Sequence, residues 1–355
     1  MAKTGSIFLN LIKSLTPQKI EGIISHFKDT EKILSARDND LRQIPILNDK
    51  DIRAIIDTRN SDTLEEELKL IAKEDVAVID IFDSSYPVLL KEISHPPLVL
   101  YLKGDAAVLD KFLFAIVGTR LPTLYGISMA EVFSYKLASL GLVIVSGLAR
   151  GVDTAAHKGA LKAGQTVAIL GSGLANIYHR ENKALFEQIT AKGSVISEFA
   201  FREPPLKENF PRRNRIVSGL CRGVLVVEAA VKSGALITAH LALEQNREVF
   251  ALPGKVDSAL SKGAHHLIKE GAKLVDCVED ILEELNIEFK GTEEARPCLE
   301  RLEQTIFDLI HSEGIYLEEI ILKSQLEQSA ANRILLNLQL KGLIKEPKPS
   351  CFVRI

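Results

Sequence analysis

Between Leu113 and Val275, short apolar runs alternate with longer segments of helical periodicity, and this alternation limits the possible folds more than any other feature of the chain. Continuous apolar strands separated by helices indicate a parallel sheet that is buried on both faces. The sequence therefore predicts an α/β protein with a doubly wound, mostly parallel sheet. Its strands are predicted at 114–117, 142–145, 166–170, 194–197, 224–227, 248–252 and 273–275.

The regions on either side of this sheet are organised differently. The first 62 residues contain short segments with apolar residues at helical spacing, and two further strands are predicted at 76–82 and 98–102. Near the C-terminus, three predicted helices precede a short hairpin, an order typical of a winged helix. The expected domains are a helical domain at 1–62, a central domain at 63–287, a linker at 288–297 and a winged-helix-like domain at 298–355.

The overall composition indicates that any excess of positive charge is local. Lysine and arginine (44 together) nearly balance aspartate and glutamate (47), so the formal net charge is −3 and a generally basic surface is excluded. The four cysteines are far apart and form no CxxC pair, which favours reduced thiols in a cytoplasmic protein over a zinc site or a disulfide scaffold. The chain has no signal-peptide pattern and no apolar run of membrane-spanning length, so we expect neither secretion nor a membrane contact.

The segment from Phe210 to Leu220 concentrates positive charge in what reads as the first turn of a helix. Pro211 suits that position, because the N–H that proline lacks would be unpaired there. Repelling cations at this end oppose the helix dipole, whereas guanidinium groups and free backbone N–H groups together suit a phosphate. An exposed basic turn paired with nearby acids explains the segment equally well. The candidate residues are Arg212, Arg213, Asn214 and Arg215.

Loops that follow the predicted strands repeatedly carry glycines and cations. Since ligands of open parallel sheets bind at the carboxyl ends of the strands, where strand order reverses, we expect these loops to meet at one site. Glycines allow backbone N–H groups to approach an anion closely, and cations add charge. The recurrence of the pattern predicts phosphate binding. The candidates are Gly118, Arg120, Ser146, Gly147, Arg150, Gly171, Gly173, Lys232, Ser233, Gly234 and Lys255.

The pattern favours an extended polyanion over a mononucleotide or dinucleotide. Gly171-x-Gly173 lacks the third glycine of a dinucleotide fingerprint, and the sequence contains no Walker loop. Asp153, a candidate helix N-cap, precedes His157 by four residues, and we expect a structural hydrogen bond between them rather than a metal or catalytic pair. No nucleophile–base set can be assembled from the sequence, which indicates a binding protein without a metal or cofactor.

The motifs in these loops resemble those of the DNA-processing protein A family (DprA, also called Smf). The resemblance implies a Rossmann-like core, usually dimeric, with an N-terminal helical domain of the SAM or helix-hairpin-helix kind and often a C-terminal winged-helix-like domain. It also implies binding of single-stranded DNA, protection of incoming strands during natural transformation and help in loading the RecA recombinase. The matching stretches, within about 113 to 285, are 115–120, 146–157, 196–198, 210–220, 232–238 and 253–254.

The resemblance also implies roles for individual residues. Arg120 matches the basic residue after the family's first strand, 213–215 match its RNR element, and Lys232 matches the lysine of its KSG element. These positions imply a pocket in which cations neutralise phosphates, while Asn214 and glycine N–H groups fix the strand. The chain departs from the family pattern at Leu121, Ala175, His179 and His265, where lysine, aspartate, proline and asparagine are usual.

Two other functions stay open on the sequence. A Rossmann-like hydrolase of nucleoside monophosphates would use an acid beside a glycine-rich loop, and Glu228 lies near Lys232. A duplex-DNA regulator would use the C-terminal domain, but that region has eight basic and eight acidic residues from 296 to 355, and its predicted recognition helix is mostly apolar or neutral. Because the chain has no tryptophan, base stacking would rest on Phe210 and Tyr178.

Overall fold

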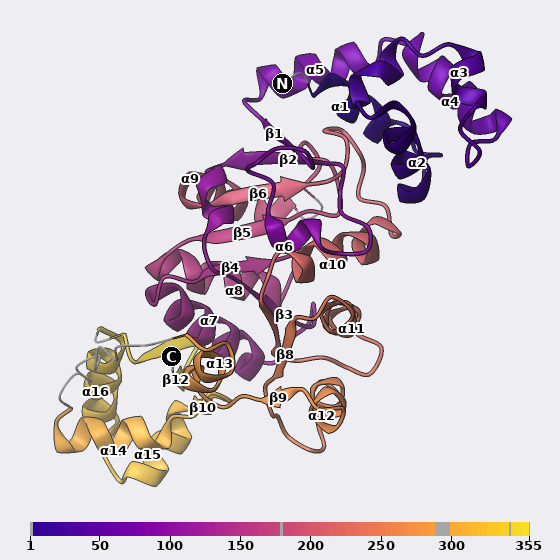
Figure 1. The fold of residues 1–355 in the computed structure, drawn as a ribbon. Helices are drawn as coiled ribbons and strands as arrows, with labels where there is room; N and C mark the ends of the chain where they lie inside the picture. The colour runs from indigo at the N-terminus through magenta and orange to yellow at the C-terminus, as the bar shows by residue number, and fades with distance from the viewer. Residues whose placement is uncertain (1–2, 178–179, 288–298, 341, 355) are drawn as a thin grey trace.

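The computed structural model describes residues 3–177, 180–287, 299–340 and 342–354. The linker expected at 288–297 lies outside these residues, as do Tyr178 and His179. At the centre is a nine-stranded sheet with the order β1-β2-β6-β5-β4-β3-β7-β8-β9 (Figure 1). Its strands are β1 Ala77–Asp80, β2 Val99–Gly104, β3 Leu113–Val117, β4 Val143–Ser146, β5 Thr166–Ile169, β6 Ser194–Ser197, β7 Gly223–Val226, β8 Glu248–Ala251 and β9 Lys273–Leu274.

The sheet confirms the predicted doubly wound, mostly parallel architecture. The strands from β6 to β9 in this order run parallel, whereas β1 and β2 are antiparallel to their neighbours. After β3 the chain builds outwards through β4, β5 and β6, and then returns to place β7 on the other side of β3, where Ala115 pairs with Val224. Strand order therefore reverses between β3 and β7, as in Rossmann-like folds.

Helices cover both faces of the parallel part of the sheet. In β3, Ala115 and Val117 belong to the apolar core beneath α10 and α11, while Phe114 and Ile116 belong to the core beneath α7 and α8. This alternation follows from the two-residue period of a strand that is buried on both sides. Within the described residues, every helix is too short or too polar to cross a membrane. The elements here are α6 Val88–Lys91, η2 Ala106–Asp110, α7 Leu124–Ser139, α8 Val152–Ala163, η3 Arg180–Asn182, α9 Lys183–Lys192, α10 Asn209–Gly219, α11 Gly234–Glu244, α12 Lys262–Lys269 and α13 Val278–Glu284.

The N-terminal helices pack against the antiparallel edge of the sheet (Figure 1). Phe8 of α1 and Tyr101 of β2 are buried in one apolar cluster, so the helices and this edge share a core. Glu67 of α5 is also buried, and it accepts a hydrogen bond of 2.7 Å from the backbone N–H of Phe201. The elements are α1 Thr4–Leu11, α2 Pro17–Phe27, η1 Thr30–Leu34, α3 Asp38–Arg42, α4 Asp49–Arg59 and α5 Thr63–Lys73.

The C-terminal unit, which begins at Leu299, lies at the other end of the sheet (Figure 1). It contains helices and a hairpin at the predicted places, and a short additional strand, β10, pairs with β12. The unit touches α7, because Ser128 donates to the carbonyl oxygen of Arg354 at 3.0 Å and Lys345 forms an ion pair of 3.1 Å with Glu131. Its assignment as a winged helix stays a prediction. The elements are α14 Arg301–Leu309, β10 Ile315–Tyr316, α15 Leu317–Ser324, α16 Gln328–Leu340, β11 Ile344–Lys348 and β12 Cys351–Arg354.

Candidate functional site

A cleft of about 630 Å³ opens at the carboxyl ends of β3 and β7, where strand order reverses. Its walls come from the loops after β3, β4 and β7, from α10 and the loop before it, and from the start of α11. The structure thus brings together candidates from four separate segments of the chain. The predicted residues that line the cleft are Gly118, Arg120, Gly147, Arg213, Asn214, Lys232, Ser233 and Gly234.

The cleft has a strong excess of positive charge. Its lining contains four cationic side chains and one carboxylate, that of Asp153. Three of the cations, Arg120, Lys207 and Lys232, are solvent-exposed. The Arg120 guanidinium also lies over the Phe210 ring, 5.2 Å from its centroid. A concave surface with cations of one sign attracts polyanions, because low-dielectric walls focus the field.

Helix α11 directs its N-terminus into the cleft. Ser233 caps this helix through its Oγ, which accepts a hydrogen bond of 3.3 Å from the N–H of Ala235. The positive end of the helix dipole and the unpaired first N–H groups therefore face the same space as the cations. The amide of Asn214 donates to the carbonyl oxygen of Gly234 at 3.3 Å and so links α10 to α11.

Most of the candidate glycines serve the packing of the protein itself. A Cβ at Gly118 would lie 2.6 Å from the Val152 side chain, and one at Gly171 would lie 2.8 Å from the Phe210 ring. At Gly173 a Cβ would meet the carbonyl oxygen of Ala200, and Gly173 and Gly171 do not line the cleft. At Gly234, by contrast, the space around the Cβ position is open. Among these glycines, Gly234 at the start of α11 therefore leaves the most room for a ligand to approach the backbone.

Arg213 forms the floor of the cleft and is only 4% exposed. Its Nη1 donates to the carbonyl oxygen of Gly147 at 2.8 Å and to that of Ile169. Burial lowers the pKa of Arg213 to about 10, although the nearby Asp153 carboxylate opposes this shift. Arg213 thus supports the loop after β4 and contributes positive charge from below, whereas the sequence suggested a direct phosphate contact.

Arg212 and Arg215 lie away from the cleft, which corrects the expectation that they share its surface. Both guanidinium groups contact the Glu198 carboxylate, at 3.2 Å from Arg212 and through a short contact from Arg215. The Arg215 side chain is 14% exposed, whereas that of Arg212 is 51% exposed. The alternative explanation, a basic turn that is paired with nearby acids, therefore applies to Arg212 and Arg215.

Two candidates, one at the end of β4 and one in the loop after it, also have other roles. Ser146 is fully buried, and its hydroxyl donates to the carbonyl oxygen of Ile116 at 2.7 Å. Arg150 forms an exposed ion pair with Glu181, in which Nη2 lies 3.0 Å from Oε2. Neither residue lines the cleft.

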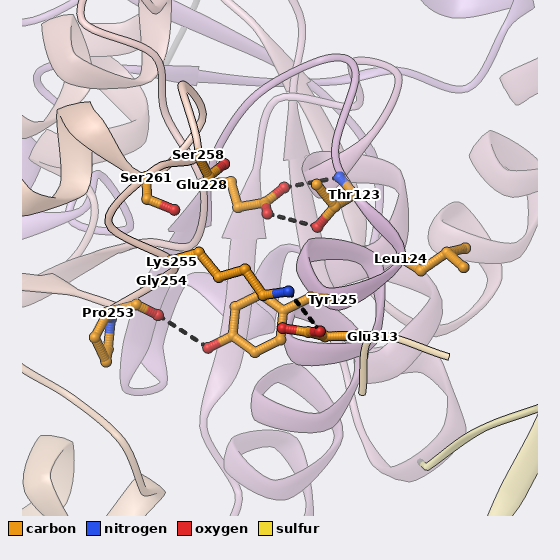
Figure 2. Close-up of a pocket in the computed structure, with 10 residues that line it drawn as sticks. All are labelled: Thr123, Leu124, Tyr125, Glu228, Pro253, Gly254, Lys255, Ser258, Ser261 and Glu313. Carbon is orange, nitrogen blue, oxygen red and sulfur yellow. Dashed lines mark hydrogen bonds and ion pairs between the residues drawn. The ribbon is translucent and has the colours of Figure 1, made fainter. Parts of the chain in front are cut away.

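Lys255 belongs to a second pocket, the C-terminal pocket, which lies between the sheet and the C-terminal unit (Figure 2). Lys255 Nζ lies 2.7 Å from a carboxylate oxygen of Glu313, so the C-terminal unit holds this cation. The Tyr125 hydroxyl donates to the carbonyl oxygen of Pro253 at 3.0 Å (Figure 2). The pocket of about 590 Å³ is lined by Thr123, Leu124, Tyr125, Glu228, Pro253, Gly254, Lys255, Ser258, Ser261 and Glu313.

Glu228 is a structural anchor in this pocket. One of its oxygens accepts from the backbone N–H of Thr123 at 2.9 Å, and the other accepts from the hydroxyl of the same residue at 2.6 Å (Figure 2). Glu228 is buried and holds the loop after β3 at the start of α7. Both oxygens are thereby engaged, which is unfavourable for the hydrolytic role considered above.

The expected hydrogen bond between Asp153 and His157 is absent from the described residues. Helix α8 begins at Val152 with Gly151 at the N-cap, so Asp153 lies inside the first turn, where it accepts from the N–H of Gly147 at 3.1 Å. His157 Nδ1 instead lies 2.7 Å from Thr166 Oγ1, on the strand beside the helix. Four-residue spacing on a helix permitted the contact, but neighbouring backbone groups and a strand hydroxyl offered better partners.

Lys207 is a cleft residue that the sequence analysis missed. It lies in the loop before α10, is exposed and lines the cleft with Arg213 and Asn214. A single lysine in a loop of ordinary composition gives no signal by itself. Its position three residues before Phe210 could have suggested it.

One group of side chains among the described residues has the spacing of metal ligands. Asp276, Cys277 and Asp280 lie together at the start of α13. The Asp280 carboxylate accepts from the backbone N–H groups of Asp276 and Cys277 at 3.0 and 3.3 Å, which is a helix cap. The capping hydrogen bonds explain the cluster without a metal.

Comparison with known proteins identifies relatives for this architecture. The profile of the DNA recombination-mediator protein A family matches residues 77–286. The chain is 48% identical over 202 residues to protein Smf of Escherichia coli, a match that covers 56% of this chain and 54% of that protein. It is 47% identical over 205 residues to the DNA processing protein DprA of Streptococcus pneumoniae, covering 58% and 72%. The chain thus spans about half the length of the first of these relatives.

Two solved structures are similar in fold and sequence. The structure of DNA processing protein A from Streptococcus pneumoniae superposes with a TM-score of 0.71 and 37% identity, over 81% of this chain and 99% of that one. The corresponding protein from Helicobacter pylori superposes with a TM-score of 0.55 and 30% identity, over 59% and 95%. The Helicobacter pylori structure is described as showing a single-stranded DNA binding mode.

Proposed function

The chain belongs to the DNA recombination-mediator protein A family, and on this premise we propose that it binds single-stranded DNA in the cleft between β3 and β7. Arg120, Lys207 and Lys232 neutralise phosphates, and the N-terminus of α11 receives one phosphate on its free N–H groups. Arg213 holds the floor in place. Such contacts position the DNA backbone without reading its sequence.

The observation that carries this proposal is the convergence of exposed cations with a helix N-terminus. Arg120, Lys207 and Lys232 come from three different loops, yet they line one cleft with Ser233 and Gly234. A polymer of phosphates engages several cations spread over a length of surface, which a single phosphate does not require. The cation excess of this lining matches that of a polyanion-binding groove.

An unpaired strand fits the cleft better than a duplex does. Phe210 lines the cleft beneath the Arg120 guanidinium and can stack on an exposed base. Bases within a duplex are not accessible to such a contact. The C-terminal unit, in which basic and acidic residues are balanced, does not offer the basic surface that a duplex-binding winged helix uses.

The wider biological role is part of the same proposal. The family is described as one of recombination mediators, so protection of incoming strands during natural transformation, transfer of the strand to the RecA recombinase and a cytoplasmic location are consistent with it. A homodimer, which the family resemblance implies, is part of the same proposal. The domains proposed for these tasks are the helices before residue 63, the sheet domain to residue 287 and the C-terminal unit.

The test is the affinity for single-stranded and duplex oligonucleotides of one sequence, measured by fluorescence anisotropy over a range of salt concentrations. We expect tighter binding of the single strand, with an affinity that falls steeply as salt rises and is insensitive to sequence. Tighter, sequence-specific binding of the duplex would overturn the proposal. Release of free base from nucleoside monophosphates would favour the hydrolase instead.

A further inference from the structure

A third pocket, the N-terminal pocket, lies between the N-terminal helices and the antiparallel edge of the sheet. Its volume is about 430 Å³, within the roughly 300–1,000 Å³ that is usual for small-molecule sites. Leu15 lines it from the loop between α1 and α2, and Ile20 and Ile24 line it from α2. Pro96 and Pro97 line it from the segment before β2. These parts of its wall are apolar, and the two prolines make one of them partly rigid.

The N-terminal pocket is also lined by polar residues, several of them exposed, and Glu198 is its buried carboxylate. This glutamate is 2% exposed, and its Oε2 contacts the guanidinium groups of Arg212 and Arg215. Its other oxygen, Oε1, is buried and has no hydrogen-bond partner among the described residues. A buried carboxylate oxygen without a donor is unfavourable, so this pocket has an unmet requirement for an N–H or O–H group.

Phe82 adds an aromatic surface at the same pocket. It lines the pocket together with the two prolines, yet its side chain is 57% exposed. A large aromatic side chain that stays in water beside an apolar pocket offers a face on which a flat ring can stack. Arg212 is an accessible guanidinium in the lining, and one of its five N–H groups is engaged with Glu198 at 3.2 Å.

We propose that the N-terminal pocket binds one unstacked nucleobase. The ring stacks on Phe82, a ring N–H or amino group donates to Glu198 Oε1, and an adjacent ring acceptor receives a hydrogen bond from Arg212. Every nucleobase carries a donor beside an acceptor on its pairing edge, which matches the carboxylate beside the guanidinium. The half-exposed Arg212 side chain moves outward to admit the base, while the buried Arg215 keeps Glu198 in place.

The base comes either from the bound DNA strand or from a free nucleotide. Helix α10 separates the two sites, with Arg213 and Asn214 on the cleft side and Arg212 on the pocket side. A strand that passes round the start of α10 can therefore place one base in the pocket while its phosphates stay in the cleft. This first source rests on the function proposed above, whereas the second does not.

The experiment compares three variants of the full chain for binding of oligothymidylate and of an abasic oligonucleotide of the same length. Phe82→Ala removes the stacking surface, Lys232→Ala removes a cleft cation, and Val88→Ala is the control, because Val88 is 72% exposed and does not line the pocket. We expect Phe82→Ala to lower affinity for oligothymidylate roughly fivefold or more, with no effect on the abasic strand. Lys232→Ala should weaken binding of both oligonucleotides, and Val88→Ala should weaken binding of neither.

Two further arms test the donor and the source of the base. An oligonucleotide of N3-methylthymine keeps the ring but lacks the N–H, so the wild-type protein should bind it more weakly than oligothymidylate. Binding of thymidine monophosphate is measured in the same way. If Phe82→Ala abolishes binding of this nucleotide but leaves strand binding unchanged, the pocket is a site for a free nucleotide. If Phe82→Ala binds both the strand and the nucleotide like the wild type, the inference is wrong. In that case, weaker strand binding by Lys232→Ala would still support the proposed function. Unchanged strand binding by Lys232→Ala would contradict both the proposed function and this inference.

Discussion

Arg213 Nη1 donates to the carbonyl oxygen of Gly147 at 2.8 Å, and this bond joins α10, which also carries Arg212 and Arg215, to the loop after β4. The guanidinium lies beside the buried Asp153 carboxylate, which is held in turn by the N–H of Gly147. The floor of the cleft is therefore a charge network inside the protein, and the exposed cations lie above it.

The first prediction concerns this floor. Arg213→Ala leaves the buried Asp153 without its attracting cation and frees two carbonyl oxygens, so we expect the free energy of unfolding to fall by about 3–5 kcal/mol. Urea unfolding measures the loss. The double variant Arg213→Met with Asp153→Asn should recover part of it, because no buried charge is left uncompensated. Equal stability of Arg213→Ala and the wild type would show that the network is unimportant.

The second prediction concerns an exposed cleft cation. Lys232→Ala should weaken binding of all single strands alike and should reduce the slope of log affinity against log salt by roughly 0.7–1, since one phosphate contact is lost. Lys158→Ala is a matched control, because Lys158 is exposed on α8 and does not line the cleft. An unchanged slope in Lys232→Ala would exclude this lysine from the strand contact.

The third prediction separates two neighbouring arginines. Arg215→Ala should destabilise the protein by about 3–5 kcal/mol, because its side chain is 14% exposed and its loss leaves the buried Glu198 with only the half-exposed Arg212 as a cationic partner. Arg212→Ala, at 51% exposure, should change stability by at most about 1 kcal/mol. Thermal and urea unfolding of the two variants, under one set of conditions, tests the difference. A reversed order would contradict the burial argument.

The fourth prediction is a dependence of stability on pH. Burial lowers the pKa of His157 to about 3, whereas the unfolded chain binds a proton with the ordinary pKa of 6.5. The unfolded state therefore gains protons first as pH falls, and the free energy of unfolding should decrease by up to roughly 1.4 kcal/mol per pH unit below about 6.5. Urea unfolding between pH 7 and 5 measures this slope, and His157→Gln should flatten it. An identical slope in both proteins would assign the dependence to other groups.

The fifth prediction concerns Lys255. Its hydrogen bond to Glu313 raises the pKa of this lysine, and the same contact occupies the cation on the side of the C-terminal unit. If the strand extends from the cleft to Lys255, phosphate competes with Glu313. Glu313→Gln should then raise the affinity for single strands about two- to fivefold, and the gain should vanish in the double variant with Lys255→Ala. An unchanged affinity of Glu313→Gln for single strands would show that the bound strand does not reach Lys255.

The strand pattern was sufficient to predict the architecture. Apolar runs on both faces of β3 and β7 required helices on both sides, and the carboxyl ends of these strands hold the cleft, as expected. The resemblance read from the loop motifs is confirmed by the family profile over residues 77–286. Local periodicity carries this information, because each strand and helix must bury its own apolar face.

The assignment of the arginines was less successful, because it depends on contacts between distant segments. Arg212 and Arg215 are three residues apart and so share a helix face that excludes Arg213, a division that the spacing itself contains. The partners could not be predicted in the same way. Glu198 at the end of β6 and Glu313 in the C-terminal unit meet their cations only through the tertiary fold.

The pairing of Ala115 with Val224 has a consequence for how the protein acquires its activity. These two residues are roughly a hundred positions apart along the chain. Their pairing aligns β3 with β7, and the walls of the cleft come from the same distant segments. Contacts between such remote segments form late, because closing a long loop costs entropy before any contact repays it. We therefore expect a nascent or truncated chain that ends before β7 to have no affinity for DNA, even where its first strands and helices have already formed.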